Sequence, residues 1–311
     1  MGNKAGIMTP DAAGIAKAAR ILRNDGLVAL PTETVYGLAA LANSAEAVAK
    51  IYRTKGRPDF NPLIVHVSSL AMAERIAVFD ERARDLAARY WPGPLTLVLP
   101  LREDAAIAPA VTAGLPTIAL RQPAHPVARA VLEALDLPLA APSANRSNAI
   151  SPTSAAHVQA SFGDAAPVLD GGLCAAGLES TIIALRPDGG WHLLRPGPIP
   201  REELELALGA EEKLRGATVE APGQLTKHYS PGKPLRLDAT ERDQDTFLIG
   251  FGQTAGDASL SCSGDLAEAA ARLYECLHLA AASAKPCIAV APIPGEGIGA
   301  AINDRLRRAA A

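Results

Sequence analysis

Hydrophobic and polar positions alternate in a way that predicts a strand enclosed by two helices near the start of the chain. Apolar residues at helical spacing follow Thr9-Pro10-Asp11, with Thr9 as the expected cap, and stop before Gly26. An apolar run at 27–30 then predicts a short buried strand, and Ser44 predicts the cap of a second helix. We therefore expect the segment 31–37, PTETVYG, to connect a strand to a helix.

The same interleaving continues as far as residue 194. Apolar runs predict strands at 63–67, 96–99, 117–120, 139–141, 180–185 and 191–194, and helical spacing predicts helices near 81–90 and 125–135. Asp188-Gly189-Gly190 lies between the last two strands and indicates an antiparallel hairpin. The sequence thus predicts an α/β or mixed α+β fold, with a twisted mixed sheet covered by helices.

The pattern changes after residue 200. A charged helix at 201–208 leads into a stretch rich in proline and glycine, with little periodicity, up to about 232. Beyond it, strands at 235–237, 247–250 and 287–291 and helices at 266–281 and from 298 predict a small Rossmann-like α/β domain. We predict a large domain at 1–205, a linker at 206–234 and a small C-terminal domain at 235–311.

Composition fits a globular chain and narrows the function classes. The 311 residues are 49% hydrophobic and 20% charged, which allows a substantial core. A net charge of −3 argues against a protein that binds nucleic acid through bulk positive charge, although a local basic groove stays open. No leader, membrane span or CxxC pair is evident in the sequence, so we expect a cytoplasmic protein without a zinc site.

A cationic cluster is the first candidate for chemistry. Lys50, Arg53, Lys55 and Arg57 lie within eight residues, and Lys55 and Arg57 are expected to follow the helix on a loop. Two or three such cations suit a triphosphate, because each is worth about 4 kcal/mol at about 4 Å before desolvation. The alternative is a solvated helix end, where cations offset the helix dipole.

Hydroxyl-rich loops form the second group of candidates. Thr32 lies in PTETVYG, Ala141 ends the strand predicted at 139–141, and Ser143 and Ser151 follow it. Ends of strands are where sheet proteins gather ligands. Such residues also cap helices and turns without any other role.

Three further polar residues lie in or at the end of apolar strands. His66 lies within LIVHV, where a buried structural histidine is the commoner occurrence. Arg121 and Arg195 close the strands TIALR and HLLR and are suited to bind a carboxylate or phosphate, or to form a structural salt bridge. The chain contains neither a GxxxxGK[ST] loop nor a GxSxG elbow, so any ATP site lacks a P-loop.

Taken together, the motifs resemble the YrdC-type threonylcarbamoyl-AMP synthases in their long two-domain form. The resemblance rests on motifs in family order: PTETVYGLAA, KGRP with NPLIVHV, WPGPLTLVLP, TAGLPTIALRQPAHP, APSANRS, ESTII and LRPGPI. APGQLTKHYSP is similar to the linker, and GEGIGAAINDRLRRAA to the end of the C-terminal domain. It implies a YrdC-like catalytic domain and a nucleotidyltransferase that joins L-threonine, bicarbonate and ATP for N6-threonylcarbamoyladenosine modification of tRNA.

The resemblance also implies a role for each matching residue. Those expected around L-threonine are Thr32, His66, Arg121, Ala141 and Ser180. Those expected around ATP are Lys55, Arg57, Asn61, Thr117, Ser143, Ser151, Arg195 and, from a linker acting as a lid, Tyr229. Lys55 and Arg57 are the expected catalytic residues, stabilising charge on the phosphates with Mg²⁺.

Two other interpretations stay open from sequence. A module of the same fold could bind RNA in a basic groove without ligation, and salt-sensitive RNA binding without nucleotide binding would favour it. A carbamoyl-transfer domain would be expected to carry zinc-binding cysteines, which the sequence lacks. For the synthase we expect a downstream tRNA threonylcarbamoyl transferase as partner, weak contact with tRNA and no membrane association.

Overall fold

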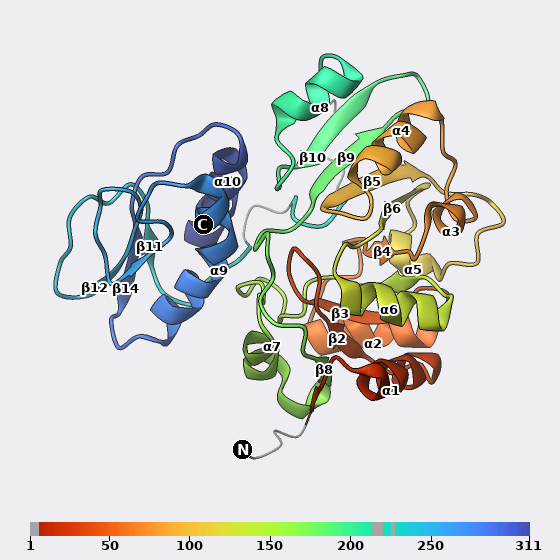
Figure 1. Cartoon of the computed structure of the whole chain (residues 1–311), viewed down its shortest axis with the longest axis horizontal. Coiled ribbons are helices and arrows are strands. Elements are labelled where there is room, and N and C mark those ends of the chain that lie inside the picture. Colours follow the sequence, from red (N-terminus) through yellow and green to blue (C-terminus); the bar gives the residue numbers. More distant parts are fainter. Residues whose placement is uncertain (1–5, 213–219, 225–227) are drawn as a thin grey trace.

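The computed structural model describes residues 6–212, 220–224 and 228–311, and two sheets organise them. The larger sheet has ten strands and the smaller has four. Figure 1 shows the smaller sheet beside the large domain, with helices α9 (Leu266–Ala282) and α10 (Ile298–Ala310) on the side that faces it. The helices of the small domain therefore make its contact with the large one.

The large sheet is mixed, as the sequence predicts. Its order is β1-β8-β2-β3-β7-β4-β6-β5-β9-β10, in which β4–β6 and β5–β9 are parallel and β2–β3 and β5–β6 antiparallel. The strands are β1 (Ile7–Met8), β2 (Val28–Leu30), β3 (Gly37–Leu41), β4 (Ile64–His66), β5 (Leu95–Pro100), β6 (Thr117–Arg121), β7 (Leu139–Ala140), β8 (Val168–Leu169), β9 (Thr181–Leu185) and β10 (Trp191–Arg195). The predicted antiparallel hairpin at 180–194 is confirmed as β9 and β10.

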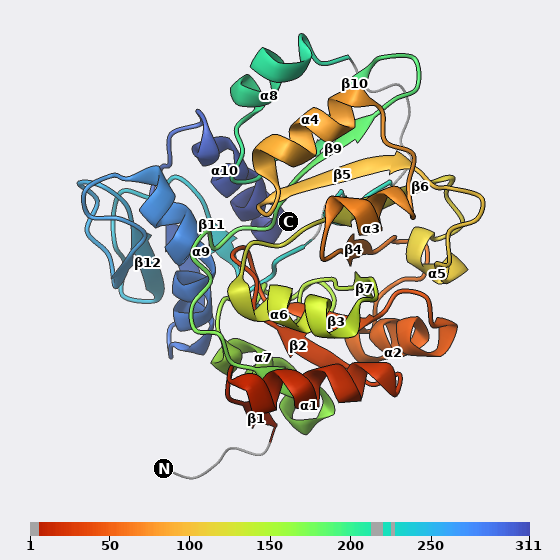
Figure 2. The same ribbon diagram turned by 45° about the vertical axis from the view of Figure 1, so that its right-hand side comes forward.

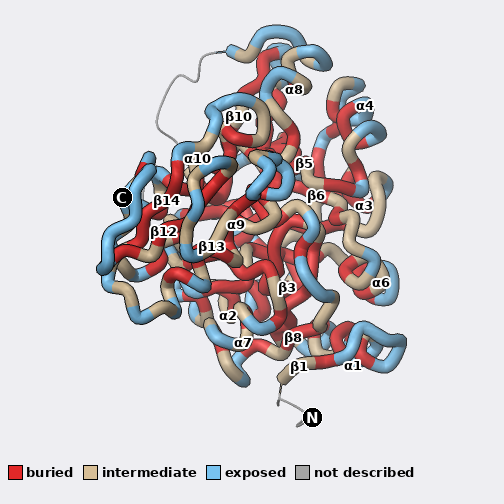
Figure 3. Tube along the Cα trace, turned by 60° about the vertical axis from the view of Figure 1, so that its left-hand side comes forward, coloured by how far each residue is buried: buried red, intermediate tan, exposed pale blue. Residues whose placement is uncertain are grey.

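Helices cover the large sheet, and their apolar faces form the core. They are α1 (Ala12–Arg23), α2 (Ala45–Lys55), α3 (Leu70–Glu74), α4 (Glu81–Tyr90), α5 (Pro109–Thr112), α6 (Pro126–Leu135), α7 (Ala155–Phe162) and α8 (Arg201–Leu208), with a short 3-10 turn at Gly163–Ala165. Helices α1 and α6 pack side by side, as Figures 1 and 2 show. Figure 3 shows that the strands are buried and that exposed positions lie mainly on outer helices and loops.

Three local predictions are wrong. Segment 31–37 joins β2 to the antiparallel strand β3 and not to a helix. The sequence did not predict β3, because residues 37–41 are buried throughout and lack the polar alternation that marks a half-exposed strand. The cap of α1 is Asp11, whose carboxylate accepts from the Gly14 amide. Lys55 is the last residue of α2, which ends at the left-handed Gly56.

The small domain matches the predicted Rossmann-like pattern. Its strands β11 (Leu235–Arg236), β14 (Cys287–Val290), β12 (Thr246–Gly250) and β13 (Ala258–Ser259) are parallel in that order, and α9 and α10 pack together beside them. The predicted boundary at 205/206 falls inside α8, and residues 213–219 and 225–227 of the predicted linker lie outside the described residues. The domain boundaries therefore stay a prediction.

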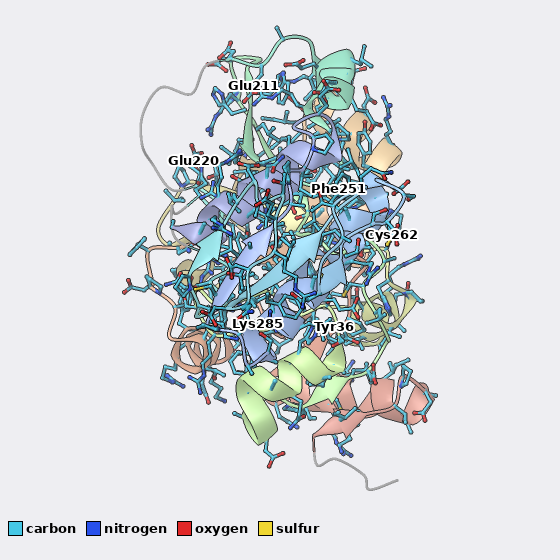
Figure 4. The ribbon with its side chains drawn as sticks, turned by 90° about the vertical axis from the view of Figure 1, so that its left-hand side faces the viewer. Tyr36, Glu211, Glu220, Phe251, Cys262 and Lys285 are labelled. Atoms are coloured by element: carbon cyan, nitrogen blue, oxygen red, sulfur yellow. The ribbon has the colours of Figure 1, made fainter. Side chains whose placement is uncertain are left out.

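Ion pairs join several charged residues outside the core. Figure 4 labels Glu211 and Glu220, which pair with Arg201 and Arg186 of the large domain. The labelled Cys262 is exposed in the small domain. Among the described helices, none combines the length and apolar character needed to cross a membrane.

Candidate active site

One cavity is lined by residues of the large domain and by Pro222, Gly223, His228 and Tyr229. Its lining includes every residue predicted for threonine, namely Thr32, His66, Arg121, Ala141 and Ser180, and four of those predicted for ATP, namely Arg57, Ser143, Arg195 and Tyr229. Lys55, Asn61, Thr117 and Ser151 are not part of the lining. The cavity is only about 40 Å³, room for a few water molecules.

Thr32 shapes the loop that closes one side of the cavity. Its hydroxyl accepts from the amides of Thr34 and Val35 at 3.2 Å each and donates to the Val35 carbonyl at 2.6 Å. The turn-capping role that the sequence left open is therefore present, and the same buried hydroxyl borders the cavity. The turn-capping role is thus observed, and the ligand-binding role of Thr32 stays a prediction.

Arg121 is held rigidly at the end of β6. Its guanidinium donates to a Glu33 carboxylate oxygen at 2.6 Å, to the Thr34 hydroxyl at 2.8 Å and to the Gly93 carbonyl at 3.1 Å. Burial raises the pKa of Glu33, but the charge and hydrogen bond of Arg121 outweigh it and leave that pKa below its ordinary value. The result is a fixed, ionised pair at the cavity wall, able to present the guanidinium to a ligand carboxylate.

His66 faces the same cavity from the end of β4. Burial lowers its pKa to about 3, and the nearby Arg121 charge adds to the effect. The imidazole is therefore neutral near pH 7, so it can orient a ligand by hydrogen bonding but supplies no positive charge.

The hairpin of β9 and β10 brings Ser180 and Arg195 together. The Ser180 hydroxyl lies 2.7 Å from that of Thr96 and accepts from Arg195 Nη2 at 3.1 Å, while Arg195 Nε donates to the Ser180 carbonyl at 3.1 Å. Burial lowers the pKa of Arg195. Ser180 is predicted to contact threonine and Arg195 to contact ATP, so these hydrogen bonds connect the two predicted sets of residues.

Lys55 and Arg57 carry charge that only neutral groups contact. Lys55 Nζ donates to the carbonyls of Ser143 and Asn145 at 2.5 Å each, and Arg57 donates to the carbonyls of Asn61 and Pro62 at 3.2 and 2.9 Å. Burial, with the neighbouring Arg57, lowers the pKa of Lys55, and burial lowers that of Arg57 to about 10. Neither forms an ion pair with a carboxylate of the described residues.

Several buried polar atoms around the cavity have no hydrogen-bond partner among the described residues. They are the Tyr229 hydroxyl, His228 Nδ1, Asn61 Oδ1 and Asn145 Oδ1. Buried polar groups normally have partners, so a cluster of exceptions beside a cavity indicates a ligand site. Tyr229 itself takes a left-handed backbone conformation, φ 64°, and is 1% exposed.

Sequence reasoning missed two residues of the lining that carry chemistry. Glu179 precedes Ser180 and begins the motif ESTII, but the sequence analysis gave it no role. His228 precedes Tyr229 within APGQLTKHYSP, the motif similar to the family's linker, and was likewise given no role. Burial lowers the pKa of His228 to about 3.

The fold and site together define a YrdC-type α/β protein with an added C-terminal domain. The family described as "Telomere recombination" (Sua5_yciO_yrdC) matches residues 20–197, and the family described as "Threonylcarbamoyl-AMP synthase, C-terminal domain" matches residues 199–311. The chain belongs to the threonylcarbamoyl-AMP synthase family.

Relatives and solved structures agree with that placement. Threonylcarbamoyl-AMP synthase from Bacillus subtilis is 39% identical over 95% of this chain and 92% of its own length. The threonylcarbamoyl-AMP synthase from Pyrococcus abyssi is 38% identical over 94% of this chain and 92% of its own length. A crystal structure of P. abyssi Sua5 complexed with L-threonine is 36% identical, covers 98% of this chain and 97% of its own, and has a TM-score of 0.89.

Proposed function

We propose that this chain is an L-threonylcarbamoyladenylate synthase, which forms threonylcarbamoyl-AMP and pyrophosphate from L-threonine, bicarbonate and ATP. Family membership over nearly the whole chain supports the activity. The observation that supports this site is one cavity lined by Arg121, Arg57 and Arg195. Arg121 forms an ion pair with Glu33, whereas Arg57 pairs with no carboxylate of the described residues. An ion-paired arginine suits a zwitterionic amino acid, and arginines without a carboxylate partner suit a polyanionic nucleotide.

Arg121 would bind the threonine carboxylate. Its guanidinium is fixed by Glu33 and Thr34, so little side-chain entropy is lost on binding. Neutral His66 and the hydroxyls of Thr32 and Ser180 would orient the amine and hydroxyl of the substrate. Ile64 and Ala141 offer apolar contact to its methyl group.

The chemistry needs positioning and no enzyme nucleophile. The threonine amine forms a bond to the carbon of bicarbonate, which loses the elements of water and leaves an N-carboxy carbamate. A carbamate oxygen then attacks the α-phosphorus of ATP, and the bond to the bridging oxygen of the β-phosphate breaks, so pyrophosphate leaves. Exclusion of water protects the labile carbamate, and cations offset the charge that develops on the phosphates.

Lys55, Arg57 and Arg195 are the cations for those phosphates. Arg57 and Arg195 line the cavity directly. Lys55 Nζ lies behind Ser143, whose carbonyl it contacts, so it would act either through this turn or by reaching the phosphates after a local shift. Asn61, Thr117, Ser143 and Ser151 complete the proposed ATP set.

Mg²⁺ is the expected cofactor, arriving with ATP. Glu33 and Glu179 are committed to Arg121 and Arg305, so phosphate oxygens and water would be its main ligands. When bound, it would neutralise charge on the departing pyrophosphate.

Tyr229 and its neighbours would act as a lid. Known sites for drug-sized ligands have volumes of about 300–1,000 Å³, far above the 40 Å³ of this cavity. Pro222, Gly223, His228 and Tyr229, which line the cavity, therefore have to move before both substrates fit. Closure would then exclude water from the carbamate. The activated product would pass to a tRNA threonylcarbamoyl transferase, with only weak contact between this chain and tRNA.

The test is pyrophosphate release by the purified chain with ATP and Mg²⁺, measured in the full mixture and after omission of L-threonine or bicarbonate. Release that needs both co-substrates, with threonylcarbamoyl-AMP detected by mass spectrometry, supports the proposal. Release that ignores threonine, or none at all, refutes it. Salt-sensitive RNA binding without ATP binding would then favour the RNA-binding alternative.

A further inference from the structure

Glu179 is a large-domain residue that the C-terminal domain holds in place. Tyr274 of α9 donates its hydroxyl to the carboxylate, at 3.0 and 2.8 Å from the two oxygens, and Arg305 Nε of α10 lies 2.8 Å from one of them. The Ser151 hydroxyl completes the shell at 2.5 Å. Arg305 is fully buried and Glu179 is 6% exposed, so this contact between the domains is shielded from water.

The two domains approach closely where this contact forms. Gly177 has φ 65°, and a side-chain carbon added there would lie 2.4 Å from the Ala271 Cα of α9. Only glycine allows the loop before Glu179 to lie against the backbone of α9. Figure 1 shows α9 and α10 on the face of the small domain toward the large one, consistent with this docking.

Glu179 lies between two arginines that belong to different domains. Burial raises its pKa, but Arg305 first and Arg195 second reverse the effect, together with the hydrogen bond from Ser151, and lower it to about 2. The carboxylate is therefore ionised and attracts both guanidinium groups. Arg195 is nevertheless bonded to Ser180 and borders the cavity, and Arg305 makes the direct ion pair with Glu179.

Arg305 also contacts the strand end and the lid. Its Nη2 donates to the carbonyl of Pro196, which follows Arg195, at 2.9 Å. Its guanidinium lies over the Tyr229 ring at 5.5 Å from the centroid, and the Tyr229 and Tyr274 rings are 5.6 Å apart. One side chain of the C-terminal domain thus touches the segments that carry Ser180, Arg195 and Tyr229.

We infer that Arg305, assisted by Tyr274, is a positioning residue of the active site: it neutralises Glu179 and so leaves Arg195 available to the nucleotide phosphates. Without Arg305, the buried carboxylate still attracts Arg195, and Arg195 turns from the cavity to pair with it. The small domain is then part of the ATP site as well as an anchor for the linker. This inference rests on the proposed synthase function, which assigns Arg195 to ATP.

The test measures ATP affinity by calorimetry on the full-length chain, alongside the KM for ATP and kcat of threonine-dependent pyrophosphate release. Arg305→Met should weaken ATP binding about tenfold, equal to about 1.4 kcal/mol, because Arg305, Glu179 and Arg195 belong to one network of interacting charges. Arg305→Lys, which keeps the charge, should stay within about threefold of the parent chain. Adding Glu179→Gln to Arg305→Met should restore most of the affinity, because a neutral amide no longer attracts Arg195.

Arg242→Met is the matched control. Arg242 pairs with Asp257 inside the small domain, so its loss removes an ion pair of that domain while leaving the contact with Glu179 intact. We expect unchanged ATP affinity. Equal weakening by Arg242→Met and Arg305→Met would overturn the inference, as would a double variant that binds ATP no better than Arg305→Met alone.

Tyr274→Phe keeps the test decisive if Arg305→Met does not fold. The substitution removes only the hydroxyl that bonds to Glu179 and should raise the KM for ATP about three- to tenfold with kcat nearly unchanged. Unchanged ATP affinity in a folded Tyr274→Phe chain refutes the inference. Because affinity is measured without turnover, an inactive parent chain that binds ATP would refute the proposed function alone.

Discussion

The two ends of the cavity balance their charges differently. At the end around Arg121, the guanidinium is paired with Glu33 at 2.6 Å, so the wall has little net charge. At the end around Arg57, and behind it at Lys55, the cations contact backbone carbonyls and, for Arg57, the Tyr52 hydroxyl, and they pair with no carboxylate of the described residues. The first arrangement suits a zwitterion, whose own charges cancel, and the second suits a polyanion that supplies the missing negative charge.

The difference predicts that the two ends respond differently to a bound ligand. A buried ion pair satisfies itself at the amino-acid end. At the phosphate end, burial lowers the pKa of Lys55 and, to about 10, that of Arg57, which shows that the protein itself stabilises these charges incompletely. Binding of an anion would restore that stabilisation, so affinity for the nucleotide should depend on charge more steeply than affinity for threonine.

Removal of Lys55 should give the largest effect. We expect Lys55→Met to lower kcat/KM for ATP about 100- to 1,000-fold, the typical cost of losing one preorganised electrostatic contact in an active site. The KM for threonine should change much less. Steady-state pyrophosphate release at varied ATP and varied threonine checks both values.

Arg53→Met is its control, since Arg53 is an exposed cation of the same helix. Unchanged kinetics there would show that position, and not overall charge, decides the effect. If Lys55→Met released pyrophosphate at the parent rate, the assignment of Lys55 to the phosphates would fail.

Substitution of Arg121 tests the opposite end. Arg121→Lys keeps the charge but loses the guanidinium fork that bonds to Glu33 and Thr34 and would present a second face to the ligand carboxylate. We expect the KM for threonine to rise about 100-fold, since hydrogen bonds to charged groups contribute about 1.5–3 kcal/mol each, while the KM for ATP stays nearly constant. Arg129→Lys, at an exposed pair with Glu133, is the control. A larger change for ATP than for threonine would reverse our assignment of the two ends.

The elements around this site were predictable where local signals were strong. Helix α4 was predicted at 81–90 and is observed there, because Asp80 caps it and its apolar face repeats at helical spacing. Strand β3 was missed because Gly37–Leu41 is buried on both faces and carries no alternation. The residues that the motifs predict for threonine all line the cavity, each near the end of a strand or in a loop, and their role in binding threonine stays a prediction.

Contacts between residues far apart in the sequence could not be predicted. Glu179 and Arg305 are 126 positions apart, and nothing local in either segment predicts that they meet. Likewise, no pattern indicates that Lys55 donates to carbonyls 88 and 90 positions away. Charge balance at a buried site depends on such contacts, so the difference between the two ends was visible only in the fold.

Discrimination between threonine and serine probes the apolar side of the amino-acid end. The two substrates differ by one methyl, which Ile64 and Ala141 are placed to contact. A buried methyl is worth about 1–3 kcal/mol, so kcat/KM for serine should be about 10- to 200-fold lower. Competition between the two amino acids in one reaction, with products resolved by mass spectrometry, measures the ratio. Much stronger rejection would require a polar contact to threonine beyond simple packing.

The smallest effect concerns stability in mild acid and again separates the two ends. Burial lowers the pKa of His66 to about 3 from an ordinary 6.5, so the folded state favours the neutral ring. The unfolded chain takes up this proton as pH falls below about 6.5, while the folded chain does not until about 3, so His66 lowers stability progressively across that window. His66→Gln should therefore flatten the fall in melting temperature between about pH 7 and 5 by a few degrees.

Glu179→Gln is the control. The pKa of Glu179 is about 2, compared with an ordinary value of 4.5, so its contribution to stability is lost only below about pH 4.5. The slope of melting temperature from pH 7 to 5 should therefore be unchanged in Glu179→Gln. Equal flattening by both substitutions would show that His66 does not govern the acid response of the amino-acid end.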